Sequence, residues 1–234
     1  MKAWRWIPWS NLDLALISTF LLIVGGVWAF LETMFSVQSG RTREFDEHLI
    51  RSLRHPNDLS DPIGPIWFQE MARDITALGS GTALALVTGS VAGYLLLVRK
   101  THALGVLLTA TIGAAILSYL LKDYFARPRP ELVSHLAHVT SASFPSGHAM
   151  LSATVYLTLG TLLARLAEPW RLKFYFVAIA TFLTFIIGVS RIYLGVHWPT
   201  DVLAGWSAGL TWALLCGLVA RSLQRQGAME TTAS

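Results

Sequence analysis

Long apolar stretches separated by short polar segments dominate the pattern of this 234-residue chain. Each stretch approaches the roughly 20 residues that a helix needs to cross the hydrocarbon core of a bilayer. The apolar residues are continuous rather than alternating, which favours helices over the strands of a barrel. We therefore expect an all-α, polytopic membrane protein. Six spans are predicted, at Leu14–Leu31, Ile75–Val98, Leu104–Leu121, Ala149–Ala164, Phe174–Val189 and Val202–Val219.

The connections between these spans predict how the chain is arranged across the membrane. Two connections are long, residues 32–74 and 122–148, and the turn 190–201 is short. Six crossings place all three on one side of the membrane and both termini on the other. The whole chain, 1–234, is expected to form a single integral membrane domain, with two terminal segments outside the bundle: 1–12 and 225–234.

The first long connection has amphipathic character. Apolar residues recur there at helical spacing between charged ones, at Phe45, Leu49, Ile50 and Leu53. A helix lying in the membrane interface fits this pattern, and a loop packed on the bundle fits it equally well. Arg73 and Asp74 end the connection and could pair with each other or touch a lipid headgroup. We favour a structural role, because charged residues at a span end are ordinary interfacial anchors.

Composition agrees with the bilayer as solvent. Hydrophobic residues make up 53% of the chain and charged residues only 14%, against about 25% in soluble domains. The net charge is +4, but no Lys/Arg-rich block with interleaved aromatics suggests a nucleic-acid partner. Cys216 is the single cysteine, so the sequence holds no intramolecular disulfide and no cysteine pattern of a zinc site.

The distribution of positive charge predicts the orientation. Each side of the membrane carries nine Lys and Arg residues in the six-span layout. Three of those on the side opposite the termini, Lys122, Arg129 and Arg191, have a chemical reason to be there. Without these three, nine Lys and Arg residues are on the side of the termini and six are on the opposite side. The short loops, too, favour cytoplasmic termini. We expect a multi-pass protein of the cell inner membrane with its functional site on the outer face.

The tetrapeptide Pro145-Ser146-Gly147-His148 begins the fourth span. Ser146 suits the N-cap of a helix, and Gly147 lets the backbone approach a ligand closely. Free N–H groups at a helix start attract an anion. His148, in the first turn, can reach the oxygen of a leaving group. Taken alone, the motif is explained as well by simple helix capping.

A pair of cations follows the third span. Lys122 closes the span, and Arg129 stands seven residues later between Pro128 and Pro130, which hold the backbone extended. Lysine offers a point charge and arginine a planar fork, and both suit phosphate oxygens. Taken alone, the pair is explained by a snorkelling lysine and a solvated loop. Arg127 lies outside the pattern and is assigned to that solvated loop.

The turn between the last two spans carries Arg191, His197 and Asp201. A carboxylate beside one imidazole nitrogen fixes the tautomer and leaves the other nitrogen free to attack. Alone, this turn could be an interfacial turn capped by Asp201. The three motifs together supply three cations, two histidines, a hydroxyl and a carboxylate on one membrane face. That set is sufficient for phosphoryl transfer through histidine without a metal.

These motifs, Lys-x6-Arg-Pro, Pro-Ser-Gly-His and Ser-Arg-x5-His-x3-Asp, resemble the signature of the type 2 phosphatidic acid phosphatase superfamily. The motifs cover about a third of the chain, from Lys122 to Asp201. The resemblance implies that His197 attacks phosphorus, that Asp201 orients it, and that His148 protonates the leaving oxygen and then activates water. It also implies that the phosphate oxygens are held by Lys122, Arg129, Arg191, Ser146 and the Gly147 N–H.

The resemblance implies metal-independent hydrolysis of a phosphomonoester or diphosphate on a membrane lipid, with no metal and no cofactor. The bacterial phosphatidylglycerophosphatase B and undecaprenyl-diphosphate phosphatase branch is the nearest in size. A lipid phosphotransferase using the same phosphohistidine, or a non-enzymatic lipid carrier, remains an alternative. Vanadate haloperoxidases have a similar pocket but are typically soluble. The expected partners are a phospholipid or polyprenyl phosphate and the bilayer, with no nucleic acid and no obligatory protein partner.

Overall fold

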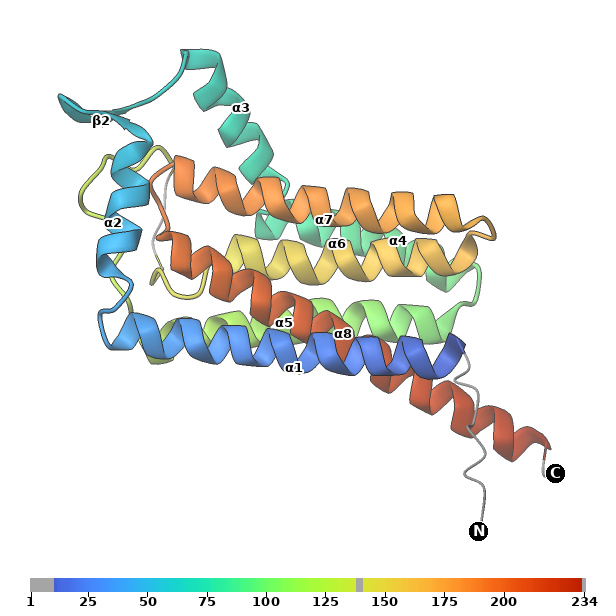
Figure 1. The fold of residues 1–234 in the computed structure, drawn as a ribbon. Coiled ribbons are helices and arrows are strands. Elements are labelled where there is room, and N and C mark those ends of the chain that lie inside the picture. Colours follow the sequence, from blue (N-terminus) through green and yellow to red (C-terminus); the bar gives the residue numbers. More distant parts are fainter. Residues whose placement is uncertain (1–10, 138–140, 233–234) are drawn as a thin grey trace, which may run out of the picture.

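The computed structural model describes residues 11–137 and 141–232. It is a bundle of helices with one small antiparallel hairpin (Figure 1). The predicted segment 1–12 falls almost entirely outside the described residues. The elements in chain order are α1 Asn11–Gln38, α2 Arg43–Ser52, β1 Arg54–His55, β2 Asp58–Pro62, α3 Ile66–Ala77, α4 Gly81–Leu97, α5 Thr101–Phe125, α6 Gly147–Leu166, α7 Trp170–Tyr193 and α8 Pro199–Thr232.

Five helices of the described chain, namely α1, α5, α6, α7 and α8, are long and apolar enough to cross a membrane. A sixth crossing comes from α3 and α4, which pass the same test together but meet at a 47° bend. The all-α, multi-pass prediction is therefore confirmed. The predicted second span, Ile75–Val98, ignored the break: α4 begins only after Ser80, whose side chain caps it by accepting the Ala83 N–H.

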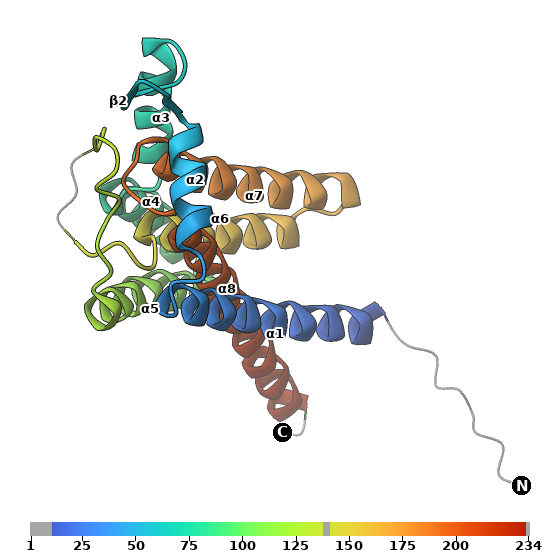
Figure 2. The ribbon, with the colours of Figure 1, turned by 60° about the vertical axis from the view of Figure 1, so that its left-hand side comes forward.

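The helix predicted in the first long connection is α2, and it packs on the bundle. Its buried face carries Asp46 and Ile50. Ile50 joins a cluster with Val133 and Val202, from the segment after α5 and from α8. Both views show α2 lying across one end of the spanning helices rather than alongside them (Figures 1 and 2). The amphipathic pattern thus produced a helix whose Leu49 and Ile50 pack on the protein, whereas Phe45 of the same stripe is 51% exposed.

The helix α6 forms the centre of the bundle, in contact with α4, α5, α7 and α8. Its start is held tightly against α8 by two glycines. A Cβ at Gly205 would lie 2.6 Å from the Ser146 carbonyl oxygen, and one at Gly209 would lie 2.4 Å from that of Met150. Small residues allow helix backbones to approach this closely in membranes. This packing fixes the first turn of α6 beside the first turn of α8.

The connections that carry the motifs meet at one end of the bundle. The α1–α2, α5–α6 and α7–α8 connections lie together at the left of Figure 1. The start of α1, the α6–α7 turn and the end of α8 lie at the opposite end, as the six-span layout predicts. The last helix continues to Thr232, well past the predicted span end at Val219.

Candidate active site

The first turn of α6 presents a free hydroxyl. Ser146 occupies the N-cap position, and its backbone N–H donates to the Asp201 carbonyl at 2.9 Å. Its side chain makes no capping bond, and its buried Oγ has no hydrogen-bond partner among the described residues. The capping explanation therefore fails for this hydroxyl. A buried polar atom without a partner is costly unless a ligand satisfies it.

Gly147 brings α5 close to the same turn. A Cβ here would lie 3.3 Å from Ser118 Oγ and 3.4 Å from Lys122 Cε. The lysine of the first motif is thus in contact range of the second motif, from a different helix. Its ammonium donates to the Ala142 carbonyl, which turns it toward the segment just before α6.

The other two predicted cations come from different parts of the chain, Arg129 from the segment after α5 and Arg191 from the last turn of α7. Arg129 donates from Nε to the Ser141 carbonyl at 2.8 Å and from Nη1 to the Val196 carbonyl. Arg191, which is 3% exposed, donates from Nη1 to Thr76 on α3 at 3.1 Å, and its buried Nε has no partner in the described chain.

These cations share one property: none of Lys122, Arg129 and Arg191 forms an ion pair within the part of the chain that the structure describes. Their hydrogen bonds go to neutral carbonyl and hydroxyl oxygens instead. Buried charges are normally paired. Three gathered cations without a carboxylate therefore make a site suited to a multiply charged anion.

The predicted nucleophile is buried against one of these cations. Nη1 of Arg129 lies 3.2 Å from Nε2 of His197, which is 2% exposed. A guanidinium can only donate hydrogen bonds. Nε2 must therefore accept, and a neutral His197 carries its proton on Nδ1. This is the tautomer that leaves a lone pair on Nε2, facing the cations.

The electrostatic surroundings favour that neutral form. Burial holds the pKa of the His197 imidazole well below its ordinary value of 6.5. The next largest contributions come from the positive charges of Arg191, Arg129 and Lys122. Burial also lowers the pKa of the Arg129 guanidinium, against a smaller opposing effect of the Asp201 charge.

The predicted Asp201–His197 contact is present but long. Oδ2 of Asp201 lies 3.5 Å from Nδ1 of His197. A serine that the sequence analysis missed lies beside both groups: the buried Ser143 hydroxyl donates to Asp201 Oδ2 and lies 3.4 Å from Nδ1. Its oxygen can accept a hydrogen bond from the Nδ1–H of His197 while its own O–H donates to the carboxylate. Nothing in the motif spacing marked this residue.

Arg127 was assigned to a solvated loop, and the structure contradicts this. Its Nη1 donates to Asp201 Oδ1 at 2.6 Å and its Nη2 to Asp46 Oδ2 at 2.8 Å. Asp46 in turn accepts the Thr200 N–H at 3.0 Å and the Thr200 hydroxyl at 2.7 Å. One signal could have revealed this bridge: Asp46 stands four residues before Ile50, on the buried stripe of α2.

His148 is not part of the hydrogen-bonded Asp201 network that the structure describes. It is half-buried in the first turn of α6. Its Cδ2 would lie 3.4 Å from a Cβ at Gly79, so it faces the break between α3 and α4. The charges of all three predicted cations act on it, as does the His197 ring. The two histidines are therefore close enough to interact electrostatically with each other and with the same three cations.

The remaining expectations have different outcomes. Arg73 donates to the Leu136 carbonyl at 3.1 Å, a contact within the protein that agrees with the favoured structural role, and no ion pair joins it to Asp74 among the described residues. Within residues 11–137 and 141–232, no group of three or more His, Cys, Asp or Glu side chains is arranged to hold a metal. Metal independence stays a prediction.

Comparison with known proteins identifies the family. A family model described as the PAP2 superfamily matches residues 103–225, which include all three motifs. "Phosphatidylglycerophosphatase B" of Bacillus subtilis (strain 168) is 36% identical over 149 residues, 62% of this chain and 71% of that protein. An "Undecaprenyl-diphosphatase" of Sulfolobus acidocaldarius is 32% identical over 125 residues, 51% of this chain and 56% of that protein.

A solved structure agrees over most of the fold. The crystal structure of a transmembrane PAP2 type phosphatidylglycerolphosphate phosphatase from Bacillus subtilis superposes with a TM-score of 0.77 and 29% sequence identity. The match covers 86% of this chain and 96% of that chain. The motifs, the family model and the shared fold all indicate the same family: the chain belongs to the PAP2 superfamily.

Proposed function

We propose that this protein hydrolyses a phosphomonoester or diphosphate on a membrane lipid through a phosphohistidine, without a metal. One observation carries the proposal. Three buried or half-buried cations without carboxylate partners surround a neutral histidine whose Nε2 holds a lone pair. An anion with several oxygens satisfies the cations, and its electrophilic centre then lies in front of the nucleophile.

In the first step, Nε2 of His197 attacks phosphorus. A nitrogen–phosphorus bond forms while the bond from phosphorus to the leaving oxygen breaks. His148 gives a proton to that oxygen. Arg129 transfers its hydrogen bond from Nε2 to a phosphate oxygen as the substrate enters. Asp201, with Ser143, stabilises the charge that develops on the His197 ring.

In the second step, water attacks the phosphohistidine. His148, now neutral, takes a proton from the water, and the nitrogen–phosphorus bond breaks to release inorganic phosphate. The equatorial oxygens are held by Lys122, Arg129 and Arg191, with the Ser146 hydroxyl and the Gly147 N–H. Phosphoryl transfer mainly requires positioning and charge stabilisation, which fixed cations supply as magnesium does elsewhere.

The substrate class follows from the membrane setting and the relatives. The relatives are named for phosphatidylglycerophosphate, undecaprenyl diphosphate and lipid A 1-phosphate. We place this chain among enzymes acting on such lipids, with phosphatidic acid as a further candidate. We also propose that the termini are cytoplasmic and that the site faces the outer side of the inner membrane.

The test is phosphate release by the detergent-purified protein with excess EDTA, over a panel of lipid phosphates and diphosphates. His197→Ala should abolish release. His102→Ala is the matched control, because His102 lies at the opposite end of the bundle, in the first turn of α5. Brief mixing with a ³²P-labelled lipid should leave acid-labile, alkali-stable label on the wild-type protein and none on His197→Ala.

The alternatives predict different results. A phosphotransferase would label the histidine but release phosphate slowly unless an acceptor lipid is added. A lipid carrier would show neither label nor release while still binding the lipid. Loss of release in EDTA, restored by a divalent cation, would overturn the metal-independent mechanism.

A further inference from the structure

A cleft lies at the end of the bundle opposite the candidate active site, among α1, α6, α7 and α8. Its volume is about 520 Å³. Ligand pockets in proteins are commonly about 300–1,000 Å³. Apolar side chains form most of its wall, among them Leu22, Leu157 and Leu214. In a membrane-spanning bundle, a wall of this kind is suited to a hydrocarbon chain.

Three cations from three different helices border this cleft. Arg165 is in the last turn of α6, Lys173 is near the start of α7, and Arg221 is on α8. No Asp or Glu is among the described residues that line it. None of the three cations forms an ion pair with another described residue. The cleft is thus apolar inside, and the positive charges at its border are not balanced by a described carboxylate.

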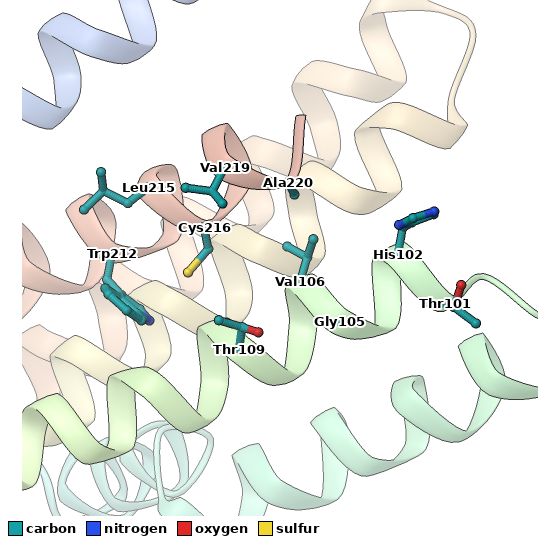
Figure 3. A pocket seen from close by; sticks show the side chains of 10 residues that line it. All are labelled: Thr101, His102, Gly105, Val106, Thr109, Trp212, Leu215, Cys216, Val219 and Ala220. Carbon is teal, nitrogen blue, oxygen red and sulfur yellow. The ribbon is translucent and has the colours of Figure 1, made fainter. Parts of the chain in front are cut away.

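A second cleft on the other side of α8 provides a comparison. It has a volume of about 410 Å³ and lies between α5 and α8, with Val106, Cys216 and Val219 on its walls (Figure 3). Its ionisable lining residues include His102 but no Lys or Arg. Similar space at the same end of the bundle therefore exists without the cations, so the charge is a specific property of the first cleft.

The first cleft exists because α8 diverges from its neighbours. Near its start, a Cβ on Gly209 would collide with the α6 backbone, whereas a Cβ on Gly217 would meet no atom within 4 Å. Both views show the second half of α8 leaving α6 and α7 (Figures 1 and 2). The cleft is therefore built into the path of the helix rather than left by one small side chain.

We propose that this cleft binds an anionic phospholipid from the membrane leaflet opposite the active site. The headgroup phosphate lies among Arg165, Lys173 and Arg221, and an acyl chain enters the apolar part. Basic pockets between membrane helices recognise anionic headgroups in this way. The site is separate from the catalytic residues and does not depend on the proposed reaction.

The experiment counts bound lipid by native mass spectrometry. The purified protein is mixed in detergent with palmitoyl-oleoyl phosphatidylglycerol or with the phosphatidylcholine of the same chains. The test variant is Arg165→Gln/Lys173→Gln/Arg221→Gln. The matched control, Arg99→Gln/Lys100→Gln/Arg171→Gln, removes three positive charges at the same end of the bundle but outside the cleft.

Wild type and control should bind one phosphatidylglycerol with about tenfold or greater preference over phosphatidylcholine, and the test variant should lose that preference. Equal loss in both triple variants would overturn the proposal, because it would reflect general charge rather than the cleft. Equal binding of the two lipids by wild type would overturn it too. Retained phosphate release shows that the test variant is folded. If the wild-type protein releases no phosphate at all, an unchanged thermal midpoint shows that the test variant is folded. The lipid-binding result then still tests the cleft, although the proposed function has failed.

Discussion

The contact between Arg129 and Nε2 of His197 makes the protonation of the nucleophile measurable. The pKa of His197 is held below 6.5 by burial and by nearby cations, so the ring stays neutral as the pH falls through 6.5. Protonation removes the lone pair, so kcat/KM should fall only at lower pH. Arg129→Gln removes a neighbouring positive charge, which raises the pKa, and should move this acid limb to higher pH.

The measured quantity is the difference in the position of the acid limb between wild type and Arg129→Gln. The substrate phosphate also titrates near pH 6, but it does so equally with both proteins. Arg73→Gln is the control: it removes an exposed cation at the same end of the bundle that does not act on the His197 pKa. An acid limb that stays in place in Arg129→Gln would contradict the assignment of His197.

The buried Ser143 hydroxyl also makes a testable contribution. Its position between Nδ1 of His197 and Asp201 indicates that it helps orient the ring. Ser143→Ala should lower kcat about ten- to a hundredfold, the effect of removing a hydrogen-bond partner that orients a functional histidine. KM should change little, since the phosphate oxygens are held elsewhere. The control is Ser134→Ala, because Ser134 is an exposed serine in the same connection. If Ser143 had a purely structural role, Ser143→Ala would lower the thermal midpoint and leave kcat of the folded fraction unchanged.

For individual residues, the sequence was sufficient to predict that the cations and histidines of the motifs lie at one end of the bundle. Each of them is near the end of a span, and the number of spans determines which ends are on the same side. It could not reveal Ser143 or Arg127. Their roles depend on how the segment before α6 folds over the start of α8, and that path is set by tertiary contacts such as the Ser146 N–H to the Asp201 carbonyl.

Among the elements, α2 is tied to the catalytic turn by one buried arginine. Arg127 joins Asp46 of α2 to Asp201 of α8, and both carboxylates are fully buried. Arg127→Gln leaves two buried charges without their cation, which typically costs about 3–5 kcal/mol. We expect the thermal midpoint in detergent to fall by on the order of 10 °C.

Two comparisons sharpen that experiment. Arg43→Gln breaks an exposed i,i+4 pair with Glu47 and should cost less than about 0.5 kcal/mol. Adding Asp46→Asn to Arg127→Gln removes one of the stranded charges, so the double variant should be more stable than additivity predicts. Strict additivity would mean that Arg127 and Asp46 have no coupling energy, which would contradict a stabilising ion pair between them.

The approach of α7 to α8 depends on Gly188. A Cβ there would lie 2.3 Å from Cζ2 of Trp206. That indole cannot easily move, because Nε1 donates to the Thr184 carbonyl at 3.1 Å. Gly188→Ala should therefore destabilise the bundle by about 1–3 kcal/mol. Gly89→Ala, where a Cβ meets nothing within 4 Å, should be neutral or slightly stabilising in the same thermal assay; equal effects would show that the two helices can separate freely.

Hydropathy was sufficient to predict the spanning helices, since the cost of unpaired backbone groups in lipid leaves little choice of structure. It could not predict the bend between α3 and α4. The residues on both sides of that bend are apolar enough to read as one segment, and the break arises from local capping by Ser80.

For the whole molecule, the distribution of positive charge predicts the orientation in the membrane, and the structure shows which cations have other reasons for their location. Six Lys and Arg residues remained on the active-site side once the phosphate-binding three were set aside. Two of those six now have structural reasons for their location: Arg127 bridges Asp46 and Asp201, and Arg54 is only 2% exposed. Four are left. By the same reasoning, setting aside the three cations of the proposed lipid cleft leaves six at the terminal end, so the excess stays at that end and still favours cytoplasmic termini.

Cysteine labelling in intact cells tests this orientation. In a Cys216→Ser background, Ser134→Cys places a thiol on the active-site side and Glu168→Cys places one in the α6–α7 turn, and both positions are exposed. A membrane-impermeant maleimide should label Ser134→Cys in intact cells and label Glu168→Cys only after permeabilisation. The reverse pattern would put the site in the cytoplasm, where the substrate would have to be a lipid phosphate of the inner leaflet. Because phosphate release in detergent is the same in either orientation, this measurement alone decides which leaflet supplies the substrate.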